Sequence, residues 1–354
     1  MKGLSGFLVA AGLAAYCADP ACAAETPQLP GWTEGAELMQ VEPVTGQIDE
    51  LTGVVYAQII RTRSVRPLHM SLLVPRTSEP KPAVVYFPGG GFTSADHDKF
   101  LEMRVALARS GFVVASAEYR AVPDTFPALV QDAKAAVRYL RAHASQYGID
   151  PKRIGALGDS AGGYVSQMLG MTGGVEKFDT GDYLDQSSEV QAVVTIYGIS
   201  SLLNIGEGFP EEIQQVHASP SVTEALLVHG PAFRESAGAT IFSDEKKALE
   251  ASPLGYTDGE KPPFLIMHGS ADTLVSPVQS ARLYRTLKDK GCSAEYILVE
   301  GAEHGDLTWY QQPVIDKVTS WFCKTLGVAT NEGKEGEAAA AGGAAAAGDP
   351  DANL

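Results

Sequence analysis

The chain is short of positive charge and has no long apolar segment. Its 354 residues include 27 lysines and arginines against 43 aspartates and glutamates, which gives a formal net charge of −16. Such a surface repels phosphate backbones, so we expect no nucleic-acid partner. No apolar run reaches the roughly 18 residues of a membrane-spanning helix, so we expect no membrane span. A content of 45% hydrophobic and 20% charged residues is typical of a globular protein.

Several ligand-binding motifs are also missing. The sequence has no H-x-x-x-H or C-x-x-C pair, so we expect no metal site. The patterns of phosphate loops and dinucleotide folds, G-x-x-x-x-G-K-S/T and G-x-G-x-x-G with a later acidic partner, are absent as well. We therefore expect no cofactor.

Residues 1–24 have the pattern of a secretory signal peptide. A lysine near the start is followed by the apolar stretch 4–13 and by residues 21–24, which offer two A-x-A-like cleavage sites. A short buried N-terminal helix is the alternative. A lipoprotein signal ending at Cys17 is a minor alternative, against which the bulky Tyr16 argues. We expect the protein to be secreted or periplasmic.

The other end, residues 327–354, is of low complexity. It contains no aromatic residue and almost no large apolar side chain, so it cannot bury enough surface to offset its ordering entropy. We expect a disordered tail, with a short alanine helix at 338–341 or 344–347 as the alternative. The domain at 25–326 then carries −12, because the tail holds five acidic residues and one lysine and the signal holds one charge of each sign.

Two of the four cysteines remain once the signal is removed. Cys292 begins an expected strand and Cys323 lies late in the helix that follows. A helix that folds back on its strand brings its end near the start of that strand. An even number of cysteines in an exported protein favours a disulfide between them. Two reduced cysteines are the alternative.

Strands and helices alternate along the domain. Most expected strands lack a polar alternation, as strands buried on both faces do, and residues 127–145 show the clearest helical spacing. The pattern predicts an α/β fold whose mostly parallel sheet has helices on both faces and a pair of strands at one edge. The expected strands are 54–59, 68–74, 83–87, 112–117, 154–157, 193–197, 264–267 and 294–299.

Residues 200–262 break this alternation. A connection of about 60 residues inside a compact domain is usually a functional insertion, and we expect a helical cap over the site. Ligands of such sheets bind outside the carboxyl ends of the strands, so we look for chemistry directly after strands.

Gly158-Asp159-Ser160-Ala161-Gly162 follows one of these strands and opens a helix. A serine on such a sharp turn has a strained backbone, so its neighbours two positions away must lack bulk. The turn exposes the hydroxyl and places a helix N-terminus beside it, which favours developing negative charge. The pattern predicts Ser160 as a nucleophile, with a glycine-rich structural turn as the alternative.

Three consecutive glycines, 89–91, follow another strand. Glycine lets backbone N–H groups approach a ligand without a side-chain clash. We expect this loop to form an oxyanion hole together with the N–H group of Ala161, the residue after the nucleophile. A phosphate-binding loop is the alternative.

A serine nucleophile needs a base, and the base needs an orienting carboxylate. In this architecture the chain order is serine, acid, histidine. Asp272 and His304 follow expected strands in that order, and His304 is the only one of the seven histidines that comes after the acid. A structural loop histidine is the alternative. Glu303 is the competing acid but cannot easily reach back to the ring, and we expect His268 to shape the Asp272 loop.

Five segments of the chain resemble the α/β-hydrolase superfamily, in its esterase and lipase branch near the hormone-sensitive-lipase-like enzymes and the feruloyl and acetyl-xylan esterase group. The resemblance implies an eight-stranded α/β-hydrolase fold, the triad above, and oxyanion donors at Gly90, Gly91 and Ala161. Pro88 stands where lipase-like members carry histidine, which favours the carbohydrate-ester group. The segments are PGGGF at 88–92, EYRAVPDTFPALVQDAKAAVRYLR at 118–141, GDSAGG at 158–163, HGSAD at 268–272 and EHGD at 303–306.

Four further residues lie next to site loops and are candidate substrate contacts. Phe92, Tyr164 and Trp309 suit an aromatic acyl pocket, although core packing explains them equally well. Asp159 either contacts the substrate or satisfies backbone amides. Tyr197 presents the same choice, and we assign it to the core.

Together these features predict a secreted serine esterase that forms an acyl-enzyme. We expect it to act on small acyl esters or on carbohydrate-linked esters such as acetyl or feruloyl esters. A serine peptidase of the same fold and a non-catalytic ligand-binding relative are the alternatives. The acidic surface suits a neutral small-molecule or carbohydrate ester better than an anionic polymer.

Overall fold

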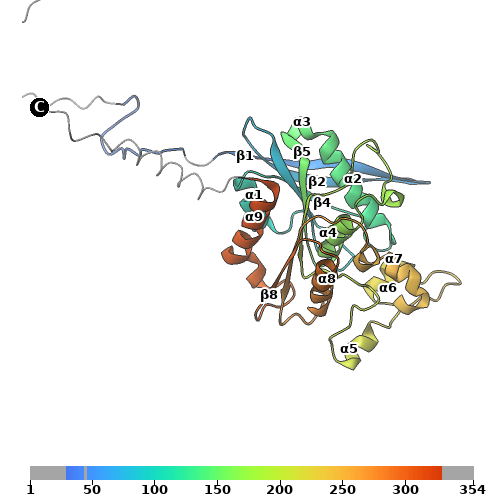
Figure 1. Ribbon diagram of the computed structural model, residues 1–354. Helices are drawn as coiled ribbons and strands as arrows, with labels where there is room; N and C mark the ends of the chain where they lie inside the picture. Colours follow the sequence, from blue (N-terminus) through green and yellow to red (C-terminus); the bar gives the residue numbers. More distant parts are fainter. Residues whose placement is uncertain (1–28, 44–45, 329–354) are drawn as a thin grey trace, which may run out of the picture. The chain divides into compact units, whose positions relative to one another are not determined.

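The computed structural model describes residues 29–43 and 46–328. The chain divides into two compact units, 1–44 and 45–354. Within the first unit, residues 29–43 form turns joined by irregular chain. The second contains an eight-stranded sheet with its helices (Figure 1). The predicted signal peptide, and the predicted tail beyond Val328, lie outside the described residues.

The strands are ordered β1-β2-β4-β3-β5-β6-β7-β8 across the sheet. β1 (Ile48–Arg61) pairs antiparallel with β2 (Ser64–Pro75), which pairs antiparallel with β4 (Val113–Ala117). All eight predicted strands are present, with the predicted strand pair at one edge. The other strands are parallel to β4 and to one another: β3 (Lys81–Phe87), β5 (Ile149–Asp159), β6 (Ala192–Ile196), β7 (Phe264–Gly269) and β8 (Ala294–Val299).

The central strands are buried, which explains their uninterrupted apolar sequences. Every residue of β3, β4, β6 and β7 is buried. β1 starts earlier than the predicted 54–59, because residues 48–53 are largely exposed and mix apolar with acidic residues. The bounds of buried strands can thus be predicted more accurately than those of the exposed edge strand.

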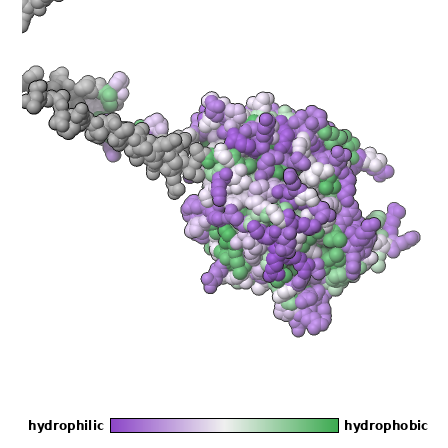
Figure 2. Space-filling view, in the orientation of Figure 1, coloured by the Kyte–Doolittle hydropathy of each residue, from purple (hydrophilic) through white to green (hydrophobic). Residues whose placement is uncertain are grey.

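Helices cover both faces of the sheet, as predicted (Figure 1). α1 (Leu101–Arg109) and α9 (Gln312–Leu326) share one hydrophobic cluster with the sheet. The cluster on the other face includes side chains of α2 (Ala128–Ala142), α4 (Ala161–Met171) and α8 (Val278–Asp289). Figure 2 shows a surface on which hydrophilic residues predominate, with apolar patches between them. Shorter helices lie at α3 (Ala144–Tyr147), Glu176–Phe178 and Leu307–Tyr310.

Between β6 and β7, where the cap is predicted, the chain forms short helices. This insertion is tied to the body of the domain, because the Phe126 N–H donates to the Leu227 carbonyl at 2.8 Å and the Tyr164 hydroxyl to the Ala251 carbonyl at 2.6 Å. Its role as a cap stays a prediction. Across residues 29–43 and 46–328, no helix combines the length and apolar character needed to cross a bilayer. The insertion contains α5 (Glu211–Val216), α6 (Thr223–His229), Ile241–Asp244, α7 (Glu245–Glu250) and Pro253–Gly255.

Candidate active site

Ser160 lies on a sharp turn between β5 and α4. Its backbone has φ 53° and ψ −121°, a positive-φ conformation that residues with a side chain rarely adopt. A Cβ at Gly158 would lie 2.0 Å from the carbonyl oxygen of Gly162, and one at Gly162 would lie 1.9 Å from that of Phe87. Both flanking positions therefore require glycine, which is the steric basis of the G-x-S-x-G spacing.

His304 joins Ser160 to Asp272 through two hydrogen bonds. His304 Nε2 lies 2.8 Å from Ser160 Oγ, and His304 Nδ1 lies 2.7 Å from Asp272 Oδ2. An ionised carboxylate only accepts hydrogen bonds, so Nδ1 carries the proton and Nε2 can accept the serine hydroxyl. Three side chains from the ends of β5, β7 and β8 thus meet in the arrangement that an activated serine needs.

Asp272 is buried, and both of its oxygens accept hydrogen bonds. Oδ1 accepts the backbone N–H groups of Leu274 and Val275, each at 2.9 Å. Oδ2 faces His304 and also His268, whose Nε2 lies 3.2 Å away. Burial opposes ionisation of this carboxyl, but its hydrogen bonds with the two histidines outweigh burial and hold the pKa of Asp272 below its usual range. The group is therefore an anion at neutral pH, as a partner of the base must be.

His268 fixes the loop that carries Asp272, as expected from its place at the end of a strand. Its Nε2 lies 2.9 Å from the Val275 carbonyl oxygen, and its Nδ1 lies 2.7 Å from Ser280 Oγ. A carbonyl oxygen only accepts, so Nε2 carries a proton, and the other nitrogen of a neutral ring accepts the Ser280 hydroxyl. Sequence reasoning missed Ser280, because a serine inside a helix carries no motif.

Glu303, the competing acid, is exposed and holds the turn before His304 through its backbone. Its N–H donates to Asp306 Oδ2 at 2.8 Å, and its carbonyl accepts the Trp309 indole N–H at 2.8 Å. Within residues 46–328, no hydrogen bond joins the Glu303 carboxylate to His304. Asp272 is therefore the carboxylate that orients the ring.

The glycine-rich loop follows β3 and lies against the nucleophile turn. A Cβ at Gly89 would lie 3.0 Å from that of Ser160, and one at Gly90 would lie 2.2 Å from the Ser94 carbonyl oxygen. In the part of the chain from 46 to 328, the N–H groups of Gly90 and Gly91 donate no hydrogen bond. Ala161 is the first residue of α4, where an N–H group has no acceptor inside the helix. All three predicted donors are thus without an acceptor in the described part of the chain, and their role as an oxyanion hole stays a prediction.

Residues 70–287 match the model of the BD-FAE family. This span contains the glycine-rich loop, the nucleophile turn and Asp272. The chain belongs to the BD-FAE family. The match confirms the predicted resemblance to α/β-hydrolase esterases.

The BD-FAE protein is similar to several esterases. It is 29% identical over 203 residues to the probable carboxylic ester hydrolase LipM of Mycobacterium tuberculosis, a match that covers 57% of this chain and 43% of LipM. It is 25% identical over 293 residues to the probable isoprenylcysteine alpha-carbonyl methylesterase ICMEL1 of Arabidopsis thaliana, with 80% of this chain and 56% of that protein covered. The chain thus spans about half the length of these relatives.

Solved structures share the fold of the BD-FAE protein. A truncated carbohydrate esterase from gut microbiota has a TM-score of 0.67 at 26% identity, over 81% of this chain and 99% of that one. Esterase Est2 of Thermogutta terrifontis, with butyrate bound, has a TM-score of 0.59 at 24% identity, over 79% of this chain and 94% of that one. These likenesses confirm the predicted α/β-hydrolase fold.

The Asp159 side chain holds the start of the glycine-rich loop, at the peptide that joins Pro88 to Gly89. The residue is 8% exposed, and its Oδ1 accepts the Tyr86 hydroxyl at 2.7 Å and the Gly89 N–H at 2.9 Å. The carbonyl of the same peptide, that of Pro88, accepts the Tyr119 hydroxyl at 2.7 Å. Of the two roles left open by the sequence, the structure shows the second, in which Asp159 satisfies a backbone amide.

The aromatic residues predicted to contact substrate belong to the core instead. Phe92, Tyr164 and Trp309 are 2%, 0% and 0% exposed, because the site loops turn their rings inward. Phe92 packs on Tyr164 with ring centroids 5.2 Å apart, and Trp309 packs on Tyr197 at 4.8 Å. Tyr197 is a core residue, as expected, but its ring also lies 4.6 Å from that of His304. Sequence reasoning missed this contact, although Tyr197 directly follows β6.

Cys292 and Cys323 are free thiols, so the predicted disulfide is not formed. Cys292 packs against the cluster on the α2, α4 and α8 face of the sheet, whereas Cys323 belongs to the cluster under α1 and α9. α9 folds back along β8, since the Trp321 indole N–H donates to Glu295 Oε1 at 3.1 Å. The sheet nevertheless separates the two cysteines, which the order of elements along the chain does not reveal.

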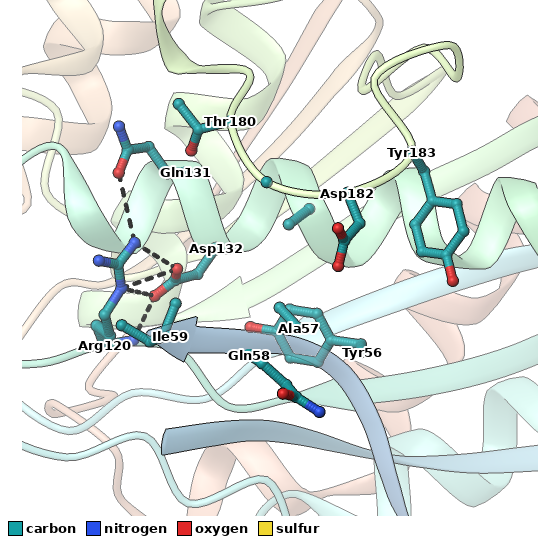
Figure 3. Close-up of a pocket in the computed structure, with 12 residues that line it drawn as sticks. Tyr56, Ala57, Gln58, Ile59, Arg120, Gln131, Asp132, Thr180, Asp182 and Tyr183 are labelled. Carbon is teal, nitrogen blue, oxygen red and sulfur yellow. Dashed lines mark hydrogen bonds and ion pairs between the residues drawn. The ribbon is translucent and has the colours of Figure 1, made fainter. Parts of the chain in front are cut away.

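A cavity of about 60 Å³ lies between β1, α2 and residues 180–183, and none of its lining residues belongs to the triad (Figure 3). Its polar wall is an ion pair in which Arg120 Nη2 donates to Asp132 Oδ1 at 2.7 Å. Arg138, further along α2, pairs with Asp179 at 2.6 Å. These polar groups satisfy one another and stabilise the fold. No group of three or more metal-ligating side chains occurs in the described residues.

Proposed function

We propose that the BD-FAE protein is a carboxylic ester hydrolase that works through a serine nucleophile. The observation that carries this proposal is the hydrogen-bonded chain from Ser160 through His304 to Asp272. It lies at the carboxyl edge of a parallel sheet, where such folds bind their ligands. The esterase relatives and the carbohydrate esterase neighbour support the same reaction class.

In this proposal Ser160 attacks the ester carbonyl while His304 Nε2 accepts the hydroxyl proton. The carbonyl oxygen becomes an oxyanion, which the N–H groups of Gly90, Gly91 and Ala161 stabilise. The C–O bond then breaks, and His304 returns the proton to the leaving alcohol. Water attacks the resulting acyl-serine by the same steps, which releases the acid and restores Ser160.

Asp272 acts through His304 and not on the substrate. It holds the ring with its proton on Nδ1 and stabilises the positive charge that the ring gains when it takes the serine proton. The four hydrogen-bond donors around its carboxylate keep the anion in place without any rearrangement during the reaction.

We infer that the substrates are small acyl esters or carbohydrate-linked esters such as acetyl or feruloyl esters. The carbohydrate esterase neighbour, 99% of whose chain is covered, supports this class. Pro88 in place of the histidine of lipase-like enzymes favours it too. The charge of −12 on residues 25–326 favours neutral substrates over anionic ones. The pattern of residues 1–24 supports a secreted or periplasmic location.

The test compares the wild type with Ser160→Ala on p-nitrophenyl esters from acetate to octanoate, on methyl ferulate and on acetylated xylo-oligosaccharides. We expect the wild type to favour short or carbohydrate-linked acyl groups. Loss of the nucleophile should lower kcat by roughly 10⁶-fold. A Ser160→Ala protein as active as the wild type would end the proposal.

A fluorophosphonate probe separates the proposal from its two rivals. Labelling at Ser160 together with ester cleavage supports the esterase. Labelling with faster cleavage of peptide amides than of esters points to a peptidase. A folded wild type that neither cleaves esters nor reacts with the probe is a binding protein.

A further inference from the structure

The peptides that offer N–H groups to the oxyanion have their carbonyl oxygens hydrogen-bonded on the opposite side. The Gly90 carbonyl, which shares a peptide with the Gly91 N–H, accepts the N–H groups of Thr93 at 2.9 Å and Ser94 at 3.2 Å. The Ser160 carbonyl, which shares a peptide with the Ala161 N–H, accepts the helical N–H of Tyr164 at 3.0 Å. The Thr93 hydroxyl also donates to the Gly90 carbonyl at 3.0 Å. All of these partners are neutral groups.

The peptide that joins Gly89 to Gly90 differs, because its carbonyl faces a positive charge. Lys99 Nζ donates to the Gly89 carbonyl oxygen at 3.1 Å. A hydrogen bond from a charged donor is roughly twice as strong as a neutral one. Hydrogen bonds along a chain also polarise one another, so an ammonium on the carbonyl strengthens the N–H at the other end of the same peptide. That N–H belongs to Gly90.

The charge of Lys99 is not cancelled by an ion pair. In residues 46–328, no carboxylate lies within ion-pair distance of its ammonium. The neighbouring acids face other groups: Asp96 accepts the Asp98 N–H at 3.0 Å, and Asp98 lies 3.9 Å from His97 Nε2. The ammonium therefore directs its charge at the loop peptide.

The backbone that carries Lys99 is anchored by side chains from the domain interior. Arg104 of α1 is 3% exposed and donates to the Lys99 carbonyl at 2.9 Å and to the Asp98 carbonyl at 2.7 Å. Ser116 of β4 donates to the His97 carbonyl at 2.5 Å. Lys99 itself is exposed, so solvent screens part of its charge. The anchors fix the backbone from which its side chain reaches the Gly89 carbonyl.

We propose that Lys99 is a positioning residue that polarises the Gly89–Gly90 peptide and so makes the Gly90 N–H a stronger donor to the oxyanion. This inference rests on the proposed function. The charge acts on the transition state, because negative charge develops on the carbonyl oxygen only there. Loss of the charge should thus lower kcat and leave KM nearly unchanged.

The experiment compares the full-length wild type with Lys99→Met, Lys99→Gln and Lys99→Arg on p-nitrophenyl acetate. Methionine removes charge and hydrogen bond, glutamine removes only the charge, and arginine keeps both. We expect kcat to fall about tenfold in Lys99→Met, less in Lys99→Gln, and to stay within about twofold in Lys99→Arg. Lys152→Met is the matched control, since Lys152 is exposed at the far end of β5.

Binding of a trifluoromethyl ketone gives the readout that a purely structural role would not move. Its adduct with the serine carries the oxyanion, so its inhibition constant should weaken in step with kcat/KM across the series. An unchanged kcat in Lys99→Met, a rise in KM alone, or arginine behaving like methionine would overturn the inference. Should Lys99→Met fail to fold, the Lys99→Gln and Lys99→Arg pair decides by the same criteria.

The inference and the proposed function can fail separately. A wild type that cleaves none of the esters refutes the proposed function. The rate of fluorophosphonate labelling at Ser160 still tests Lys99 in that case, because negative charge also develops on the phosphonyl oxygen. Equal labelling rates in the wild type and Lys99→Met would then reject it.

Discussion

Replacement of Asp272 by asparagine is the sharpest test of the arrangement around His304. Four donors surround the carboxylate: the backbone N–H groups of Leu274 and Val275 on Oδ1, and the ring N–H groups of His304 and His268 facing Oδ2. An amide has only one acceptor atom. The backbone donors cannot change, so we expect the asparagine oxygen to face them and its NH₂ group to face the histidines.

That orientation inverts the tautomer of His304. Its Nδ1 must accept a hydrogen bond from the amide, so the ring proton moves to Nε2, the atom that has to accept the proton of Ser160. Inversion of the tautomer in such a triad costs about 10⁴-fold in kcat, which is about 5.5 kcal/mol of transition-state stabilisation. His268 keeps its bond to the Val275 carbonyl, so the fold should survive.

The assay is steady-state hydrolysis of p-nitrophenyl acetate at pH 8 by purified Asp272→Asn, with circular dichroism to show that the protein is folded. Glu303→Gln is the matched control, because it makes the same change from carboxyl to amide one residue from the base. Its side chain is exposed, so we expect kcat within about twofold of the wild type. A folded Asp272→Asn with nearly full activity, or a larger loss in Glu303→Gln, would refute the assignment of the acid.

Three further predictions concern stability and thiol chemistry. Gly162→Ala should destabilise the fold by about 3 kcal/mol in urea unfolding, because the new Cβ would overlap a β3 carbonyl. Gly173→Ala, whose Cβ would make only an ordinary 3.7 Å contact, is its control, and equal losses would contradict the steric argument. Cys292 and Cys323 should both react with Ellman's reagent in denaturant. In the native protein Cys323 should not react, because it is 3% exposed and burial raises the pKa of its thiol. If the denatured protein showed no reactive thiol, the two cysteines would be joined by a disulfide and the prediction would be wrong. Folding lowers the pKa of Asp272, so its ionised form stabilises the native state above about pH 4 and this contribution disappears at lower pH. Asp272→Asn should therefore lose less unfolding free energy than the wild type between pH 5 and 3, and parallel losses would contradict the depressed pKa.

The triad could be predicted from the sequence because each of its members lies a few residues or less beyond the end of a strand in the parallel part of the sheet. Continuous apolar runs mark β5, β7 and β8, and the carboxyl ends of parallel strands lie at one edge of a sheet. Order along the chain then selects Asp272 and His304. The glycines beside Ser160 are equally readable, since their cause is local crowding of the backbone.

The direction in which a side chain points was not predictable in the same way. Phe92 and Trp309 are close to the site in sequence, but the loops turn both rings into the core. Cys292 and Cys323 lie on different faces of the sheet, and element order does not specify a face. Lys99 belongs to no motif, and only the folded loop places its ammonium on the Gly89 carbonyl.

The strand that precedes the nucleophile is held more firmly in the sheet than the strand that precedes the base. Ser160 follows β5, which has a hydrogen-bonded strand on either side. His304 follows β8, an edge strand that is only partly buried. Edge elements of this kind open locally at a lower free-energy cost than the centre of a domain. As temperature rises, turnover should therefore stop while the interior is still folded, and cooling from that point should restore it.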